Sequence, residues 1–192
     1  SNAGTGLPNA TGVTLTENSI SGYAGDGVEL VAGQYTGPLN AQLNWWGSPT
    51  GPTNPSNPAG SGETIVDPDG LVSFSPFLAS GVDAQPAVRG FQPVSPPPIG
   101  IAIVGSGFDD QLIITATSAD DGSYQLITDG VPGPVVPFTD IAFLSFAGGD
   151  GNDTLRVNNP AGGLFAPSSG VFYVGGGQSG TPGDRLEILG GA

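Results

Sequence analysis

The residues of this chain that could do chemistry are concentrated in the stretch AGGDGNDTLRV, residues 147–157. Asp150, Asn152 and Asp153 place three oxygen-bearing side chains within four positions, and calcium is bound in proteins by six to eight such oxygens. The glycines between them let the backbone turn sharply and direct its carbonyl oxygens inward. The same residue types also form turns without metal, because Asp and Asn accept hydrogen bonds from nearby backbone N–H groups. The stretch therefore predicts a turn first, and leaves open whether calcium is bound there.

Two further stretches share this arrangement of a glycine-rich turn, an Asp, one residue and a Leu. They are GSGFDDQLII (105–114) and GGGQSGTPGDRLEIL (175–189). If each interval is one wide turn of a β-solenoid, the three glycine-rich turns stack, and Asp109, Asp110 and Asp184 could complete a calcium site. In that arrangement Asp153 would face the ion and Leu155 the core. The affinity expected of such an extracellular site is modest, with a Kd on the order of 10⁻⁴–10⁻³ M.

The middle stretch matches Gly-Gly-x-Gly-x-Asp-x-Leu at every defined position. In this it resembles the repeat of the RTX, hemolysin-type calcium-binding family, and the resemblance implies a parallel β-roll in a secreted bacterial protein. The chain departs from the family pattern because only one full copy is present. Phe108 stands where the first copy should have glycine, and the third copy has a four-residue insert before Asp184.

The elements that must position these turns are predicted to be strands. Short apolar runs such as IAIV, LIITAT, YQLIT and IAFLSF are bounded by Gly, Pro, Asp or Asn, which is typical of strands and turns. No segment keeps the apolar period of an amphipathic helix. We therefore predict an all-β fold, in which residues 112–130 form an antiparallel hairpin that projects from the first repeat, with its turn around 119–123.

The N-terminal half has a repeat of its own, because Asn18-Ser19-Ile20 can be laid on Asn44-Trp45-Trp46 at a spacing of 26 residues. This overlay predicts that Trp46 points into the core and that Trp45 packs outside it or under the 53–62 loop. The stretch NWWGSPTGPTNP, followed by GETIVDPDGLVSFSPFL, resembles the last rungs of right-handed parallel β-helices of the pectate-lyase-like superfamily. The proline-rich segment after Trp46 is expected to cover the last open edge.

These patterns divide the chain into four parts. Residues 1–3 resemble a purification-tag remnant, and residues 4–80 are expected to form the C-terminal rungs and cap of a parallel β-helix. Residues 81–98 form a proline-rich linker, and residues 99–192 a β-rich, β-roll-like module. We expect the rest of a longer parent chain upstream, and weak self-association through an open rung at the N-terminal end.

Composition restricts the function. The chain has three Lys plus Arg against 17 Asp plus Glu, a net charge of −14, and no His or Cys. A nucleic-acid partner would require a basic surface, and membrane insertion would require a longer apolar run than any present. The absence of His and Cys removes the usual ligands of zinc, iron and copper. Divalent calcium is therefore the cofactor that the acidic turns favour.

The function expected is non-enzymatic and structural: an adhesin-like fragment of a large bacterial protein that is extracellular or at the cell surface, with a polysaccharide or cell-surface partner. No phosphate loop, zinc motif or nucleophile motif is present. Two alternatives remain. One is a carbohydrate-binding module that stacks sugars on Trp45, Tyr23 and Tyr35. The other is the non-catalytic tail of a β-helix enzyme that acts on polysaccharides.

Overall fold

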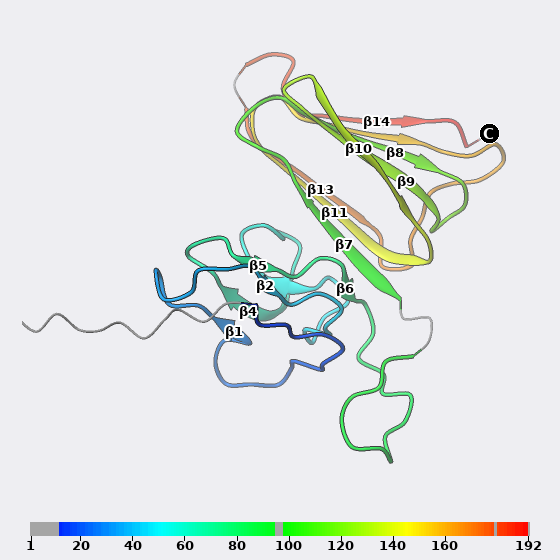
Figure 1. Ribbon diagram of the computed structural model, residues 1–192. Helices are drawn as coiled ribbons and strands as arrows, with labels where there is room; N and C mark the ends of the chain where they lie inside the picture. The colour runs from blue at the N-terminus through cyan, green and yellow to red at the C-terminus, as the bar shows by residue number, and fades with distance from the viewer. Residues whose placement is uncertain (1–11, 95–97, 179, 192) are drawn as a thin grey trace, which may run out of the picture.

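The computed structural model describes residues 12–94, 98–178 and 180–191, and this part of the chain is all-β, without a helix (Figure 1). The prediction of an all-β fold is confirmed. Accordingly, none of the described segments is a helix long and apolar enough to cross a membrane. The suspected tag remnant, residues 1–3, lies outside the described residues.

The C-terminal half consists of two open sheets that face one another. Three consecutive strand–turn–strand units, which we call rungs, each give one strand to each sheet. The first rung is β7 (Ile99–Val104) and β8 (Asp110–Ala116), the second β11 (Ile141–Asp150) and β12 (Thr154–Asn158), and the third β13 (Val171–Gly177) and β14 (Arg185–Leu189). Strands of successive rungs pair in parallel in both sheets.

The Asp-x-Leu stretches that the sequence aligns lie side by side on neighbouring strands of the sheet. Leu155 lies opposite Leu112 on one side and Leu186 on the other. In the second sheet, Phe146 lies opposite Ile103 and Tyr173. The three Asp-x-Leu stretches are therefore aligned, although 43 residues separate the first two and 31 the last two.

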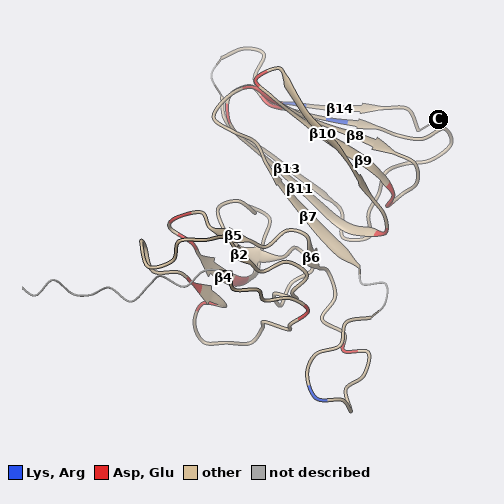
Figure 2. Ribbon diagram, in the orientation of Figure 1, with Lys and Arg blue, Asp and Glu red and all other residues tan. Residues whose placement is uncertain are grey.

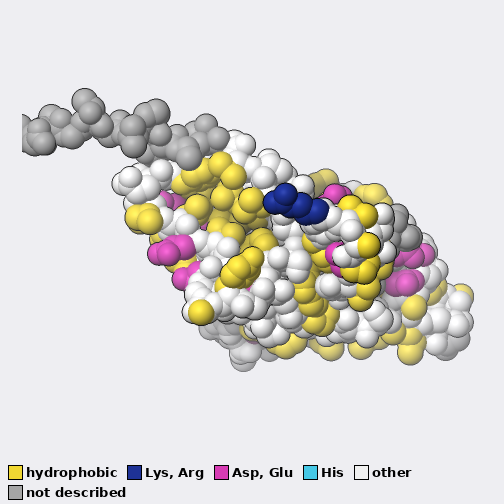
Figure 3. All heavy atoms as spheres, turned by 90° about the horizontal axis from the view of Figure 1, so that it is seen from below, with side chains coloured by type: hydrophobic (Ala, Val, Ile, Leu, Met, Phe, Trp, Pro, Cys, Tyr) yellow, Lys and Arg dark blue, Asp and Glu magenta, His cyan; other side chains and the backbone are white. Residues whose placement is uncertain are grey.

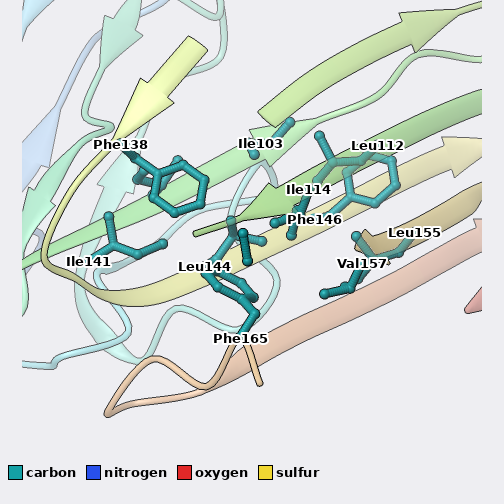
Figure 4. Close-up of a cluster of buried hydrophobic side chains, with 12 residues drawn as sticks. Ile103, Leu112, Ile114, Phe138, Ile141, Leu144, Phe146, Leu155, Val157 and Phe165 are labelled. Carbon is teal, nitrogen blue, oxygen red and sulfur yellow. The ribbon is translucent and has the colours of Figure 1, made fainter. Parts of the chain in front are cut away.

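The core lies between these two sheets, where alternate side chains of each strand point inward (Figure 4). Leu112, Leu144, Phe146 and Leu155 are all buried there. The Phe146 and Tyr173 rings are stacked, with centroids 5.5 Å apart. Burial of each large apolar side chain contributes about 1.5–3 kcal/mol to the free energy of unfolding, so this cluster holds the two sheets together.

The predicted hairpin is present, but it does not project from the first rung. Strand β9 (Gly122–Thr128) pairs antiparallel with β8, and β10 (Val131–Phe138) pairs antiparallel with β9. Together they widen one sheet to the order β10-β9-β8-β12-β14. The prediction of a projecting hairpin is wrong because the apolar side chains of β9, Tyr124 and Leu126, pack against the core between the sheets.

The N-terminal half is built from very short strands. β1 (Val28–Glu29) and β3 (Pro52–Thr53) both pair in parallel with β4 (Gly62–Val66), and β2 (Leu39–Asn40) pairs in parallel with β5 (Val72–Ser73). The 26-residue overlay is confirmed, because Ser19 forms a parallel bridge with Trp45. The Asn18 backbone N–H also donates to Oδ1 of the buried Asn44, at 2.9 Å.

Trp46 points into the core and Trp45 lies outside it, as predicted. Trp46 is 0% exposed and belongs to the N-terminal core cluster. Trp45 is half-buried, and its ring lies against Gly81, where a Cβ atom would collide with the indole. Trp45 therefore packs outside the core, beneath the start of the 81–98 segment.

The two halves share an interface. Strand β6 (Phe77–Leu78) pairs antiparallel with β7, and so joins the sheet order β13-β11-β7-β6. The Phe77 and Phe143 rings lie 6.2 Å apart, and the Ser145 hydroxyl donates to Oδ1 of the buried Asn57 at 3.2 Å. Strand β11 thus presents Phe143 and Ser145 to the N-terminal half, while Leu144 and Phe146 face the C-terminal core.

The proline-rich segment between the halves forms a loop to the side of this interface (Figure 1), narrowed by an antiparallel bridge between Asp83 and Pro93. It carries Arg89, the blue position on that loop in Figure 2. Seen from below, a small basic patch and scattered acidic side chains lie among mostly uncharged side chains (Figure 3).

Candidate functional site

The three glycine-rich turns connect the two sheets at the same end of the rungs, and acidic positions gather there in Figure 2. The turns stack because the strands on both sides of them are in register. Of the six predicted ligands, Asp110 and Asp153 are buried, Asn152 and Asp184 are half-buried, and Asp109 and Asp150 are exposed. The structure therefore brings all six to one end of the module and divides them into an inner and an outer group.

The inner group is a ladder of hydrogen bonds formed by Asp110, Asp153 and Asp184, which we call the Asp ladder. The Asp110 backbone N–H donates to Asp153 Oδ1 at 2.8 Å, and the Asp153 backbone N–H donates to Asp184 Oδ1 at 2.9 Å. The carboxylates of Asp153 and Asp184 thus each accept the backbone N–H of the ladder Asp in the preceding rung. Because a buried N–H group without a partner is costly and a carboxylate is a strong acceptor, the ladder joins the rungs at their turns.

The second carboxylate oxygens of the ladder are held differently in each rung. Asp110 Oδ2 accepts the Ser106 hydroxyl at 2.9 Å, and Asp184 Oδ2 accepts the Gln178 side-chain amide at 3.2 Å. Among the described residues, no hydrogen-bond donor reaches Asp153 Oδ2, which is buried. Asp110 Oδ1 is likewise buried without a donor in the described part of the chain, so the first two ladder carboxylates each have an unsatisfied buried oxygen.

The glycines of the turns are explained by this close packing. A Cβ atom at Gly148 would collide with the carboxylate of Asp153, and one at Gly175 would collide with that of Asp184. The backbone at Gly149 also has φ 107°, a conformation that side chains disfavour. Gly148 and Gly175 thus make room for the carboxylates of Asp153 and Asp184, whether or not an ion is present.

Burial makes the carboxyl group of Asp153, the middle member of the ladder, a weaker acid than an ordinary Asp. Burial raises the pKa of Asp153 to about 6, with further contributions from the charges of Asp110, Asp184 and Asp109, against the lowering effect of the hydrogen bond from Asp110. Burial, followed by the charges of Asp184 and Asp153, raises the pKa of Tyr173 to about 12. The Tyr173 hydroxyl donates to the Asp153 carbonyl oxygen at 2.8 Å, so this neutral group closes one side of the ladder.

The outer group borders a recess of about 420 Å³ at the surface of the turns. Asp109 and Asp150 line it, together with Asp129, which sequence reasoning missed. Asp129 lies in the turn between β9 and β10, and its backbone N–H donates to the Asp109 carbonyl oxygen at 3.0 Å. The dipeptide Asp129-Gly130 is a strong hairpin-turn signal, and could have revealed that a strand returns to this point.

The recess differs from a formed metal site in two respects. In the described part of the chain, no group of three or more acidic side chains is arranged to hold a metal ion. Asp109 is also engaged, since its Oδ1 accepts the Asn152 backbone N–H at 2.9 Å. What the arrangement offers a cation is the exposed carboxylates of Asp109, Asp129 and Asp150 around one recess, and calcium there stays a prediction.

Comparisons with protein-family models, curated proteins and solved structures found no match. The resemblances to pectate-lyase-like β-helices and to RTX repeats therefore stay predictions. The assignment of function rests on the geometry of the chain itself.

The alternative carbohydrate site is less well supported by the positions of its residues. Tyr35 is only 8% exposed, and its hydroxyl accepts the Val13 backbone N–H at 3.1 Å. Its ring belongs to the N-terminal core cluster, so it has no open face for a sugar. Trp45 packs on Gly81, and of the three aromatic residues only Tyr23 is exposed.

Proposed function

We propose that this chain is a non-catalytic, structural segment of a secreted or cell-surface bacterial protein, in which stacked β-solenoid rungs form a stiff, adhesin-like spacer. The observation that carries the proposal is the Asp ladder, which repeats one turn in three successive rungs. Each rung then buries its apolar side chains against its neighbour, as repeat proteins do. Two halves that share the contact between Phe77 and Phe143 would transmit force as one body.

We further propose that calcium stabilises this segment from the outer side of the turns. The support is electrostatic: Asp109, Asp129 and Asp150 surround one recess in a chain of net charge −14. A divalent cation there would reduce the repulsion among these carboxylates. The buried ladder acids act on the backbone, and they are not needed as ligands.

Thermal unfolding with calcium, with magnesium and with a chelator tests this proposal. We expect a folded protein in chelator, and a gain of about 1.4 kcal/mol in about 5 mM calcium if the Kd is about 0.5 mM. For a chain of this size that gain raises Tm by about 3–6 °C. Asp109→Asn and Asp150→Asn should each remove most of the gain.

Asp26→Asn is the matched control, because it removes an exposed acid from the N-terminal half and should leave the calcium effect unchanged. Identical wild-type curves in calcium and chelator would refute the calcium part of the proposal. A protein that is unfolded in chelator would refute the claim that the rungs stack without metal.

A further inference from the structure

The third rung ends the C-terminal core with an apolar surface on its open side. Leu186 and Ile188 on β14 are aligned with core positions of the two preceding rungs, Leu155 and Val157. Yet Leu186 is 57% exposed and Ile188 61% exposed, while their counterparts are buried. A recess of about 480 Å³ opens at this end of the sandwich, bordered by Leu164, Leu186, Ile188, Val171 and Tyr173. We call these five residues the end face.

The two edges of the wider sheet are protected to different degrees. Its order is β10-β9-β8-β12-β14, so β10 and β14 are both edge strands. Strand β10 contains Pro132, Pro134 and Pro137, which cannot donate to a further strand, whereas the five residues of β14 include no proline. Natural sheets use proline and charge to prevent edge-to-edge pairing. Strand β14 does carry the charged residues Arg185 and Glu187, but these two pair with each other, and no proline blocks its backbone edge as in β10. Strand β14 is therefore the edge at which a further strand can pair.

The near-zero net charge around the end face bears on which partner could bind there. Residues 154–191 contain two acids and two arginines, so the entire net charge of −14 lies in the rest of the chain. Glu187, on β14, accepts Arg156 Nε at 2.7 Å and also forms an ion pair with Arg185. Two molecules as acidic as this one repel each other at most surfaces. The end face is a region where that repulsion is small.

From these observations we propose that the end face pairs with the end face of a second copy of the chain. A two-fold axis in the plane of the end face sets the two edge strands antiparallel. If β14 pairs with β14 around Glu187, Leu186 meets Ile188 of the second copy, and both side chains point into a core shared by the two molecules. The opposed Glu187 side chains are each neutralised by arginines of their own chain.

This inference goes beyond the proposed spacer function and does not depend on calcium. It concerns the opposite end of the chain from the N-terminal rung at which weak self-association was expected from the sequence. The residues at the start of that N-terminal rung, 4–11, lie outside the described part of the chain. Pairing through the end face would join two copies of this chain at their third rungs.

The first test is the mass in solution, measured by sedimentation equilibrium up to about 500 µM, a range suited to a small interface. The wild type should be a monomer–dimer mixture, and Ile188→Lys should shift it to monomer. Val135→Lys is the matched control, since Val135 is also 61% exposed but lies on the proline-guarded edge strand β10. Both variants add the same charge. A strictly monomeric wild type, or equal loss of dimer in both variants, would overturn the proposal.

The second test traps the contact directly and does not depend on how a lysine affects folding. The chain has no cysteine, so single-cysteine variants form disulfides only between copies. Under mild oxidation, a mixture of Leu186→Cys and Ile188→Cys chains should yield at least about tenfold more covalent dimer than Val135→Cys, because the proposed register sets positions 186 and 188 opposite one another. Equal yields from the mixture and from Val135→Cys would mean that the copies meet at random and would overturn the proposal.

Discussion

The backbone N–H of Asp110 donates to Oδ1 of Asp153 across two adjacent rungs, at 2.8 Å. The two residues are 43 positions apart in the chain, and both are buried. A carboxylate used in this way acts as part of the backbone hydrogen-bond network. The Gly-Gly-Asp-Gly-Asn-Asp sequence is thus a turn whose acidic side chain faces the neighbouring rung.

The raised pKa of Asp153 predicts that stability falls as pH rises through the weakly acidic range. The folded protein binds this proton with a pKa of about 6, against 3.8 in ordinary Asp. Protonation therefore favours the folded state below about pH 4, and this contribution is lost as pH rises through 6. The shift corresponds to about 3 kcal/mol. Urea unfolding in chelator at pH 4.5, 5.5, 6.5 and 7.5 measures it.

Asp153→Asn serves as the control for this pH effect, because it keeps the acceptor oxygen and removes the titrating proton. The free energy of unfolding of this variant should be much flatter between pH 4.5 and 7.5 than that of the wild type, and higher than the wild type at pH 7.5. A wild-type stability that rises with pH over this interval would contradict the burial of an ionisable group in the ladder.

The tryptophan pair predicts two different losses of stability. Trp46→Ala should cost about 3–5 kcal/mol, because the side chain is fully buried and leaves a large cavity. Trp45→Ala should cost distinctly less, since that ring is half-buried and covers only one side of Gly81. Chemical unfolding of both variants measures the difference. Small and equal losses would mean that neither ring belongs to the core.

The contact between Phe77 and the C-terminal sheet predicts that the two halves unfold together. A Cβ atom at Gly100 would collide with the Phe77 ring, whereas one at Gly107 would meet no atom within 4 Å. Gly100→Ala should therefore lower the stability by more than about 1 kcal/mol, and Gly107→Ala should be close to neutral. Calorimetry should show one transition for the wild type, and two well-separated transitions would indicate independent halves.

Several features of the fold could be predicted from the sequence because they depend only on which residues of successive rungs are aligned. The Asp-x-Leu stretches align, and Ser19 lies beside Trp45, since residues at equivalent positions of successive rungs must share a face. The inward direction of Trp46 followed from the same overlay.

Other features could not be found in this way. Strand β10 was not expected because Pro132, Pro134 and Pro137 argue against a central strand, yet at the edge of a sheet they are tolerated. The pairing of β6 with β7 joins residues on either side of the proline-rich segment, and no pattern within either short stretch of sequence indicates it. The sequence also could not tell whether Asp153 faces an ion or an amide, because its partner lies in another rung.

The close packing of the ladder predicts that substitution of a second glycine, Gly148, also lowers the stability of the fold. Gly148→Ala would place a methyl group against the Asp153 carboxylate and should destabilise the fold, again by comparison with Gly107→Ala. If Gly148→Ala has the same melting temperature as the wild type in chelator, the Asp153 carboxylate has room to move, and the ladder is not a fixed part of the turn.

The claim that Asp153 holds adjacent rungs together is tested most directly by comparing Asp153→Ala with Asp153→Asn in chelator at pH 7. Both variants remove the charge and any role in binding metal, and only Asn keeps an oxygen for the Asp110 N–H. Loss of that acceptor leaves a buried donor unpaired, which costs about 1–3 kcal/mol. Unfolding free energies from urea titration should place Asp153→Ala below Asp153→Asn by about that amount, and equal stability of the two variants would contradict the ladder.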